Sequence, residues 1–188
     1  MYKQCSTNRT ISRQRELEGE ILKIISHKHF EKLSVVDLCE YLNIPRKAFY
    51  RYFSSKEGAL YAIIDHALTD ALENFFQLQE SAASAEQILR DFFRYWKSQR
   101  GLLDVLAYND LSGLLLQRAI NFSFGSSEIS RKIFPARNDS ERDYIAVFFI
   151  SGIISLVIQW HHGGFDRTPE QLAETAVRFI YHPELTLK

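Results

Sequence analysis

The stretch SVVDLCEYLNIPRKAFYRYFSSK, residues 34–56, carries the strongest local pattern in this chain. Its first part, residues 35–42, places apolar side chains on one helical face. Ser34 precedes this part, and Asp37 follows three residues later. A serine hydroxyl at a helix start accepts from first-turn amides, and an acid at the third position can bond back to the serine amide. The pattern therefore predicts a short helix that Ser34 caps.

A second short helix is predicted after a tight turn. Asn43 tolerates the left-handed backbone conformation that ends a helix. Pro45 has the fixed φ that suits the first turn of the next helix, which the pattern extends to about Phe53. Two short helices joined by a turn of three or four residues are typical of a helix-turn-helix.

The outward face of the second helix is rich in hydrogen-bond donors. Ala48, Phe49 and Tyr52 can turn towards the first helix. The side chains left for solvent or a partner are Arg46, Lys47, Tyr50 and Arg51. Arg can bind guanine bidentately, Lys neutralises phosphate, and a Tyr hydroxyl can donate to a phosphate oxygen. A solvated basic face is the plainer interpretation, but the adjoining turn and the aromatic run favour a surface that reads DNA.

The longer segment FEKLSVVDLCEYLNIPRKAFYRYFSSKEGAL, residues 30–60, resembles the N-terminal DNA-binding domain of TetR-family transcriptional regulators. The family pattern has a Thr or Ser opening the second helix, a Tyr near the end of the third, a following Phe, and a Lys starting the fourth. These places are held here by Ser34, Tyr50, Phe53 and Lys56. The resemblance implies that Lys56 touches the DNA backbone. It implies a DNA-binding set of Ser34, Arg46, Lys47, Ala48, Tyr50, Arg51 and Lys56.

Three positions depart from the family pattern. Asn43 stands where a Gly is usual, and Pro45 stands where a Ser is usual. The chain has HFEKL, residues 29–33, where another Gly precedes the second helix of the family. The absence of this Gly, together with the basic pair Arg46 and Lys47, makes the segment similar to the branch of the family that contains dihydroxyacetone-kinase regulators.

Charge and cysteine content agree with a DNA-reading protein. Residues 1–60 carry eleven Lys or Arg against seven acids, whereas residues 61–188 carry twelve against sixteen. The basic excess therefore falls on the predicted DNA-reading part. Cys5 and Cys39 lack metal-ligand spacing and are expected to be reduced, with Cys39 in the core. Reduced cysteines and a polar first stretch without a secretory signal predict a cytoplasmic protein.

The rest of the chain shows helical periodicity without strand-like alternation. Residues 1–10 are expected to be mobile, and a first helix is predicted from Ile11 to about Lys28, capped by Thr10 or Ser12. Further helices are predicted at 56–79, 85–98, 101–107, 109–124, 139–162 and 168–181. The predicted fold class is all-α, with a three-helix helix-turn-helix head joined by a long helix to a C-terminal helical bundle. The predicted domains are a DNA-binding domain, residues 1–55, and an effector-binding and dimerisation domain, residues 56–188.

Residues 144–160, YIAVFFISGIISLVIQW, form an uncharged run at the lower length limit of a membrane span. The polar residues within it favour a helix buried between proteins, and no membrane partner is predicted. In the TetR family the last two long helices pair with their twins across a twofold axis, so the resemblance implies a homodimer. The predicted interface residues are Phe148, Gly152, Ser155 and Trp160. An intramolecular core is the alternative, which part of this helix must serve.

Aromatic residues concentrate in the middle of the chain. At helical spacing such residues most often form core. Ligand sites in bundles also form between helices, from apolar walls with a few polar points. The predicted effector pocket comprises Phe75, Phe92, Trp96, Tyr108 and Phe122. The expected ligand is a small apolar molecule, because no cluster of charges marks this region.

Motifs of enzyme chemistry are missing from the sequence. It has no nucleotide-binding Gly-rich loop, no nucleophile elbow and no Cys/His metal spacing, so neither a catalytic site nor a cofactor nor a metal is predicted. The predicted function is a sequence-specific regulator, a homodimeric repressor that binds a pseudo-palindromic operator in double-stranded DNA and is released by an effector. The alternative is a co-regulator of the same fold that binds a protein partner and senses no small molecule.

Overall fold

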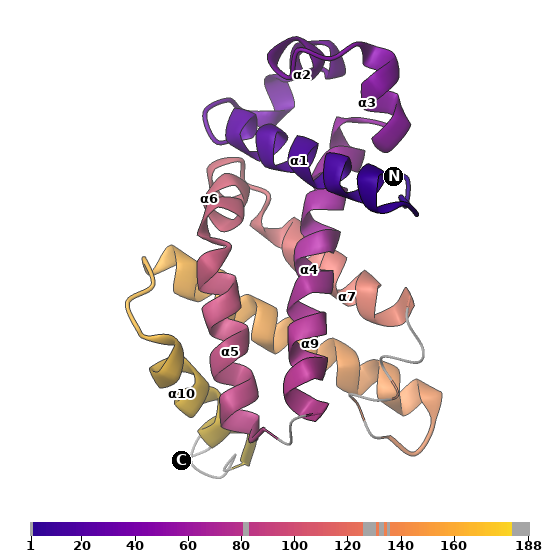
Figure 1. Ribbon diagram of the computed structural model, residues 1–188. Helices are drawn as coiled ribbons and strands as arrows, with labels where there is room; N and C mark the ends of the chain where they lie inside the picture. Colours follow the sequence, from indigo (N-terminus) through magenta and orange to yellow (C-terminus); the bar gives the residue numbers. More distant parts are fainter. Residues whose placement is uncertain (1, 81–82, 126–130, 132–133, 135, 182–188) are drawn as a thin grey trace.

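The computed structural model describes residues 2–80, 83–125, 131, 134 and 136–181. Within these ranges the fold is all-α, which confirms the prediction. The helices are α1 (Asn8–Ile25), the 3-10 helix η1 (Phe30–Lys32), α2 (Val35–Tyr41), α3 (Arg46–Tyr52), α4 (Lys56–Glu80), α5 (Ala85–Ser98), α6 (Arg100–Tyr108), α7 (Ser112–Gly125), α9 (Asp139–His162) and α10 (Pro169–Tyr181). Figure 1 shows α1 to α3 gathered as a head, with α4 running from it into a body formed by the later helices.

The first helix, α1, begins earlier than the periodicity predicted. Thr7, rather than Thr10 or Ser12, is its N-cap. The Thr7 hydroxyl accepts from the Thr10 amide at 3.4 Å, and the Thr10 hydroxyl accepts from the Thr7 amide at 3.3 Å. Threonine at the third position thus closes the reciprocal cap that Glu or Gln more often closes. The helix also ends at Ile25, short of the predicted Lys28.

The N-terminal segment is held against the head. Tyr2 forms an isolated antiparallel bridge with Phe53, and the Lys3 amide donates to the Tyr52 carbonyl at 3.0 Å. Phe53 is extended, with φ −127° and ψ 139°, so its backbone groups are open to such pairing. The expectation that residues 1–10 are mobile is therefore wrong for Tyr2 and Lys3.

The predicted turn between α2 and α3 is present. The Ser34 hydroxyl accepts from the Asp37 amide at 3.2 Å, and Asp37 Oδ2 accepts from the Ser34 amide at 2.7 Å, which confirms the predicted cap. Asn43 has φ 50°, the left-handed conformation expected of it. Pro45, with φ −68° and ψ 146°, is the N-cap of α3 rather than its first helical residue.

The long helix α4 belongs to both head and body. It packs against α1, α5 and α7. Helix α5 in turn packs against α10, and α7 against α9. In Figure 1, α4 and α5 lie side by side, with α9 crossing behind them. One continuous hydrophobic core runs from Leu17 in α1 to Ala176 in α10. The division into residues 1–55 and 56–188 therefore remains a prediction.

Polar contacts join the head to the body beside α4. Asn109, at the end of α6, accepts from the Phe30 amide at 2.7 Å and donates to the Ile25 carbonyl at 3.3 Å. Arg118 of α7 forms a hydrogen-bonded ion pair with Asp65, a buried carboxylate of α4, with Nε 2.8 Å from Oδ1. Asn109 thus attaches the head directly to the end of α6, whereas Arg118 attaches α7 to α4, the helix that carries the head.

Among the described residues, α9 is the one helix long and apolar enough to cross a membrane, with 24 residues and a mean hydropathy of 1.7 over an 18-residue stretch. The core helix of a globular protein meets the same criteria of length and composition. Here α9 packs against α5, α6 and α7. It is therefore a helix of the bundle.

Candidate nucleic-acid interface and effector cavity

Helix α3 presents its donor-bearing side chains to solvent. Phe49 and Tyr52 are buried and anchor the helix to the core. Phe49 also packs edge-on against Tyr50, with ring centroids 5.7 Å apart, which fixes the base of the Tyr50 side chain. Ala48 is half-buried, as expected for a residue at the edge of the contact with α2. The exposed residues of α3 are Arg46, Lys47, Tyr50 and Arg51.

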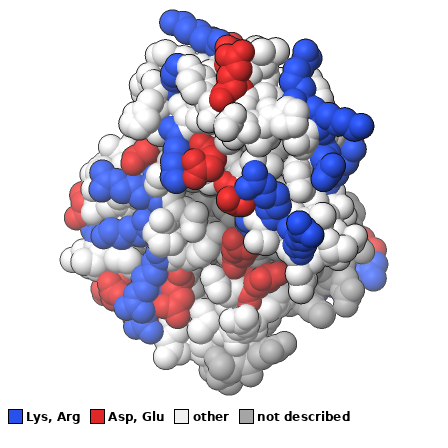
Figure 2. Space-filling view, turned by 45° about the horizontal axis from the view of Figure 1, so that its top comes forward, with Lys and Arg blue, Asp and Glu red and all other residues white. Residues whose placement is uncertain are grey.

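The cations of α3 are free of acidic partners. Its sequence RKAFYRY contains no acid, and within the described part of the chain no carboxylate pairs with its three cations. Figure 2 shows Lys and Arg gathered on the side of the head where α3 lies. By contrast, Arg13 of α1 pairs with Glu16 at 2.6 Å, and Arg15 pairs with Asp70 at 2.8 Å. Unpaired cations on one exposed helix suit phosphate and base-edge contacts.

Lys56 has structural partners that its sequence position does not reveal. Its ammonium donates to the carbonyls of Phe30 at 2.9 Å and Glu31 at 3.1 Å. It also lies 4.8 Å from the centroid of the Phe30 ring. Two of its three donors are thus occupied in fixing η1 to the start of α4. The phosphate contact implied by the family resemblance is left to the remaining donor.

Ser34 is likewise occupied, by its helix cap. Its hydroxyl and amide both bond to Asp37, and these hydrogen bonds hold the pKa of the Asp37 carboxyl below its usual value. The cap fixes the start of α2 and hence the base of the turn that positions α3. Its DNA contact stays a prediction.

The N-terminal segment adds groups that the sequence pattern missed. Because Lys3 pairs with the backbone of Tyr52, its exposed side chain lies at the end of α3. Tyr2 packs edge-on against His66, and burial together with the Asp65 carboxylate raises its pKa to about 12. Tyr2 therefore stays neutral and hydrogen-bonds Asp65. No periodic signal in residues 1–10 could have indicated this pairing.

A cavity of about 140 Å³ lies in the body between α4, α5, α7 and α9. Phe75, Phe92, Trp96 and Phe122, all predicted pocket residues, line it. Every described lining residue has an apolar side chain, and the one polar side-chain atom among them is Trp96 Nε1. The wall therefore suits an uncharged ligand, and the effector role of these residues stays a prediction.

Tyr108 lies outside the cavity. It ends α6 next to the head, is 46% exposed, and stacks on His29 with ring centroids 4.6 Å apart. Its place in the predicted pocket is thus wrong. Aromatic spacing alone does not distinguish a helix end that faces the head from a helix face that borders the cavity.

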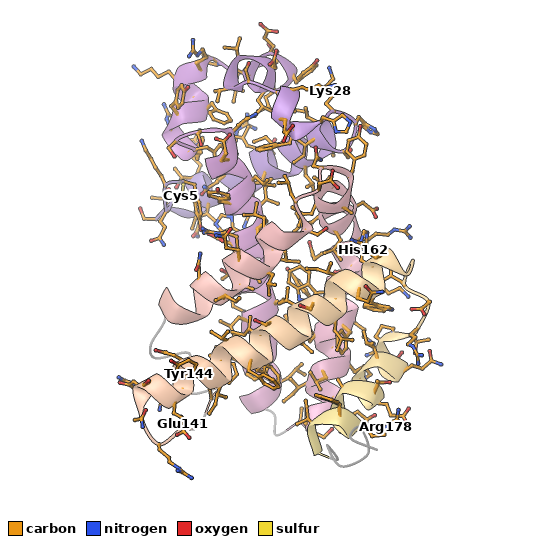
Figure 3. All side chains as sticks on the ribbon, turned by 180° about the vertical axis from the view of Figure 1, so that it is seen from behind. Cys5, Lys28, Glu141, Tyr144, His162 and Arg178 are labelled. Atoms are coloured by element: carbon orange, nitrogen blue, oxygen red, sulfur yellow. The ribbon has the colours of Figure 1, made fainter. Side chains whose placement is uncertain are left out.

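The open face of α9 carries large apolar side chains. Tyr144 and Phe148 are each 77% exposed, and Gly152 and Ser155 continue the same face. A Cβ added at Gly152 would meet nothing within 4 Å. Figure 3 shows α9 crossing the rear of the body from Tyr144 to His162, with no described helix in front of it in that view. Exposed apolar area of this kind marks an interaction surface.

Trp160 does not belong to this face. It is 3% exposed and packs edge-on against Phe93 and Phe165, with ring centroids 5.9 Å and 4.8 Å away. Its indole N–H donates to the Arg167 carbonyl at 3.1 Å. The prediction of an interface residue is wrong here, because Trp160 serves the intramolecular core.

The described residues contain no group of three or more His, Cys, Asp or Glu side chains placed to hold a metal. Cys39 is buried in the head, and burial raises the pKa of its thiol. It is thus held as a neutral core side chain, in line with its apolar helical spacing.

Two protein-family models match the chain. The model described as "Bacterial regulatory proteins, tetR family" matches residues 21–63. The model described as "Transcriptional regulator C-terminal region" matches residues 83–182, more than half of the chain. A comparison with curated protein sequences found no significant match.

Solved structures share the fold along most of the chain. A transcriptional regulator from Aquifex aeolicus VF5 gives a TM-score of 0.57 at 16% identity, over 89% of this chain and 99% of that one. The dihydroxyacetone kinase operon activator DhaS gives 0.56 at 16% identity, over 88% and 92%. The fatty acid degradation regulator FadR from Bacillus halodurans gives 0.57 at 13% identity, over 94% and 96%. At such identities the likeness shows a common fold.

Proposed function

This chain belongs to the TetR family of transcriptional regulators, and we propose that it is a homodimeric repressor released from its operator by a small apolar effector. As a family member it is a DNA-binding regulator and not an enzyme. The observation that carries the proposal is the position of α4. This helix begins beside α3 at Lys56, and its residue Phe75 lines the cavity. A single rigid element therefore connects the DNA-reading surface to the ligand site.

In the proposed complex, α3 enters the major groove. Arg46 and Arg51 are the base-reading candidates, since both are exposed and unpaired and Arg can bind guanine bidentately. Lys47 and Tyr50 contact phosphates. Two heads related by a twofold axis would bind half-sites about one helical turn apart, so the operator is pseudo-palindromic. The protein would act in the cytoplasm, where its two cysteines stay reduced.

The proposed dimer forms through α9 and α10. The open α9 face offers Phe148 as apolar area and Gly152 and Ser155 as small residues over which a second helix can approach closely. Phe179 and Ile180 of α10 are also exposed, at 53% and 46%. A twofold axis places the same surface on both partners, so each copy covers the apolar area of the other.

Effector control follows from the geometry of α4. Lys56 and Phe75 are separated by about 28 Å along the helix axis, at about 1.5 Å per residue. A ligand between α4, α5, α7 and α9 would tilt α4 and alter the distance between the two heads. The ligand lowers operator affinity only as far as it binds one distance between the heads more tightly than the other. The expected coupling free energy between ligand and operator is about 1–3 kcal/mol.

A second candidate function is supported by the same α9 face. A different protein could dock there, in which case the chain is a co-regulator without a ligand. By its name, the structural neighbour DhaS activates an operon. Activation of transcription is therefore the alternative to repression for this chain. Thermal-shift screening separates the two functions, because only a sensor is stabilised by metabolites.

The DNA-reading role is tested with alanine variants on an operator selected from a pool of random duplexes. Arg46→Ala and Arg51→Ala should each lose about 1–3 kcal/mol and relax the base preference at one position. Lys47→Ala should weaken all duplexes alike and reduce the salt slope by about one.

Lys97→Ala is the control, because Lys97 is an exposed cation on α5, outside α3 and outside the proposed dimer helices α9 and α10. It should bind the operator as the wild type does. Equal and sequence-independent losses for Arg46→Ala and Arg51→Ala would show that neither arginine reads a base.

A further inference from the structure

The start of the chain carries positive charge that no neighbouring acid offsets. The first fifteen residues contain four Lys or Arg and no Asp or Glu, and the first turn of α1 is also free of acids. Two of these four cations, Arg13 and Arg15, are held by carboxylates. The other two, Lys3 and Arg9, are exposed, and neither forms an ion pair within the described part of the chain. Their charge is thus available to a partner.

Backbone hydrogen bonds fix Lys3 beside the end of α3. Its amide donates to the carbonyl of Tyr52, the last residue of α3, at 3.0 Å. Its carbonyl accepts from Nε2 of Gln14, a buried side chain of α1, at 3.3 Å. Figure 1 shows the N-terminus on the same side of the head as α3. Arg9 lies in the first turn of α1 and, among the described residues, no hydrogen bond ties it to α3. Of the two unpaired cations, Lys3 is therefore the one that is fixed next to the DNA-reading helix.

Tyr2 determines the direction in which Lys3 points. Tyr2 forms an antiparallel bridge with Phe53, and successive side chains of an extended segment point to opposite sides. The Tyr2 ring turns inward, where it packs edge-on against His66 with ring centroids 5.5 Å apart. Its hydroxyl hydrogen-bonds the buried carboxylate of Asp65. The Lys3 side chain is therefore directed outward, in agreement with its exposure.

This anchoring lowers the entropic cost of a contact through Lys3. A lysine in a loose terminal segment would lose both backbone and side-chain freedom on binding. Here the backbone of Lys3 is already ordered in the free protein, so only its side chain would be immobilised. A lysine ammonium is a compact point charge, which suits a phosphate oxygen better than a base edge.

We propose that Lys3 is a DNA-contacting residue, whose ammonium binds a phosphate at the edge of the major groove beside the C-terminal end of α3. The proposal rests on the proposed insertion of α3 into that groove. The major groove is about 12 Å wide and phosphates line both of its edges, so a cation fixed at the end of an inserted helix lies next to one edge. Unlike Arg46 and Arg51, Lys3 adds affinity without base preference.

The test measures binding of the full chain, without an N-terminal tag, to the selected operator and to an unrelated duplex of equal length over about 50–200 mM salt. Lys3→Ala should weaken binding to both duplexes alike, about three- to tenfold at about 0.1 M salt, and reduce the salt slope by about one for each bound copy of the chain. Lys3→Arg keeps the charge and should restore the wild-type slope. Lys97→Ala, the control for loss of one positive charge, should leave the slope unchanged.

A second variant tests whether the anchor places the lysine. Tyr2→Ala keeps the Lys3 ammonium but removes the ring and hydroxyl that hold the segment, so it should lose the same part of the salt slope. Adding Lys3→Ala to Tyr2→Ala should then lower the slope no further, because both changes remove the same contact. A further fall of the slope in the double variant would show that Tyr2 does not position Lys3.

The outcomes separate this proposal from the DNA-binding function on which it rests. If Lys3→Ala bound the operator with the affinity and salt slope of the wild type, the proposal would be overturned and the DNA-reading role of α3 would remain. A loss confined to the operator would assign Lys3 to a base and contradict the phosphate contact. A wild-type chain that bound no duplex would contradict both the proposal and the proposed function.

Discussion

Asn109 offers a sharp test of how the head is attached to the body. Its side chain makes three hydrogen bonds: it accepts from the Phe30 amide at 2.7 Å and donates to the Val105 carbonyl at 2.9 Å and to the Ile25 carbonyl at 3.3 Å. Two of these bonds cross from α6 to the head. Asn109→Ala removes all three without adding bulk.

The magnitude follows from the groups left behind. The Val105 carbonyl keeps its bond from the Asn109 amide at 3.2 Å, so it loses little. The Phe30 amide and the Ile25 carbonyl, both in buried residues, lose this partner. Each buried unsatisfied group costs about 1–3 kcal/mol, and partial access of water at the half-buried junction moderates the sum. The free energy of unfolding should therefore fall by about 2–4 kcal/mol, a large part of the about 5–15 kcal/mol typical of a folded protein.

The assay is urea unfolding at fixed protein concentration, with the midpoint and slope compared between wild type and variant. Asn74→Ala is the matched control, since Asn74 is an exposed helical asparagine of α4, and it should stay within about 0.5 kcal/mol of the wild type. If Asn109→Ala unfolded at the same urea concentration as the control, the junction would not depend on these hydrogen bonds, and the reasoning would be refuted.

Three further predictions concern the turn, the cap and the dimer. Asn43→Val should lower the free energy of unfolding by about 1–2 kcal/mol, because φ 50° is unfavourable for a β-branched residue. Asn43→Gly should preserve it, because Gly adopts positive φ readily. Thermal unfolding of the two variants measures the difference. Ser34→Ala should cost about 1 kcal/mol at neutral pH through loss of the cap. The pKa of Asp37 is lowered in the folded state, so its contribution to the free energy of unfolding is present above its unfolded pKa of about 3.9. That contribution is lost as the pH falls through the folded pKa. The stability of Ser34→Ala should therefore depend less on pH than that of the wild type in this acid range. Gly152→Arg should sediment as a folded monomer that binds the operator poorly. Gly113→Arg, the control at another open helical glycine, should remain a dimer. A wild-type chain that sediments as a monomer at micromolar concentration would contradict the proposed dimer.

Features encoded by near neighbours in the chain could be predicted from the sequence. The cap at Ser34 depends on Asp37, three residues away, and the left-handed residue at Asn43 depends on its own small polar side chain. The buried positions of α3 follow from spacing around Phe49. In each case the signal and the structure lie within one or two helical turns, where local physical chemistry decides.

Features that depend on distant partners could not be predicted. Lys56 bonds to carbonyls 25 and 26 residues away, which no side-chain pattern marks. Trp160 and Phe148 both lie in the uncharged run, yet one faces the intramolecular core and the other faces solvent. Composition identifies the run as apolar, but only packing against α5, α6 and α7 decides which face of it is buried.

Because α4 is part of both the head and the body, it limits the design of chimeric regulators, in which the head of one family member is grafted onto the body of another. A graft that ended at residue 55 would discard Ile64, which is fully buried in the shared core, and the imidazole of His66. It would leave Glu18 of α1, only 5% exposed, without the partner that lies 2.9 Å away. The transplantable unit of this chain therefore extends through Asp70, which holds Arg15. Exchange of specificity between relatives should succeed when the junction lies beyond that residue, within the same helix.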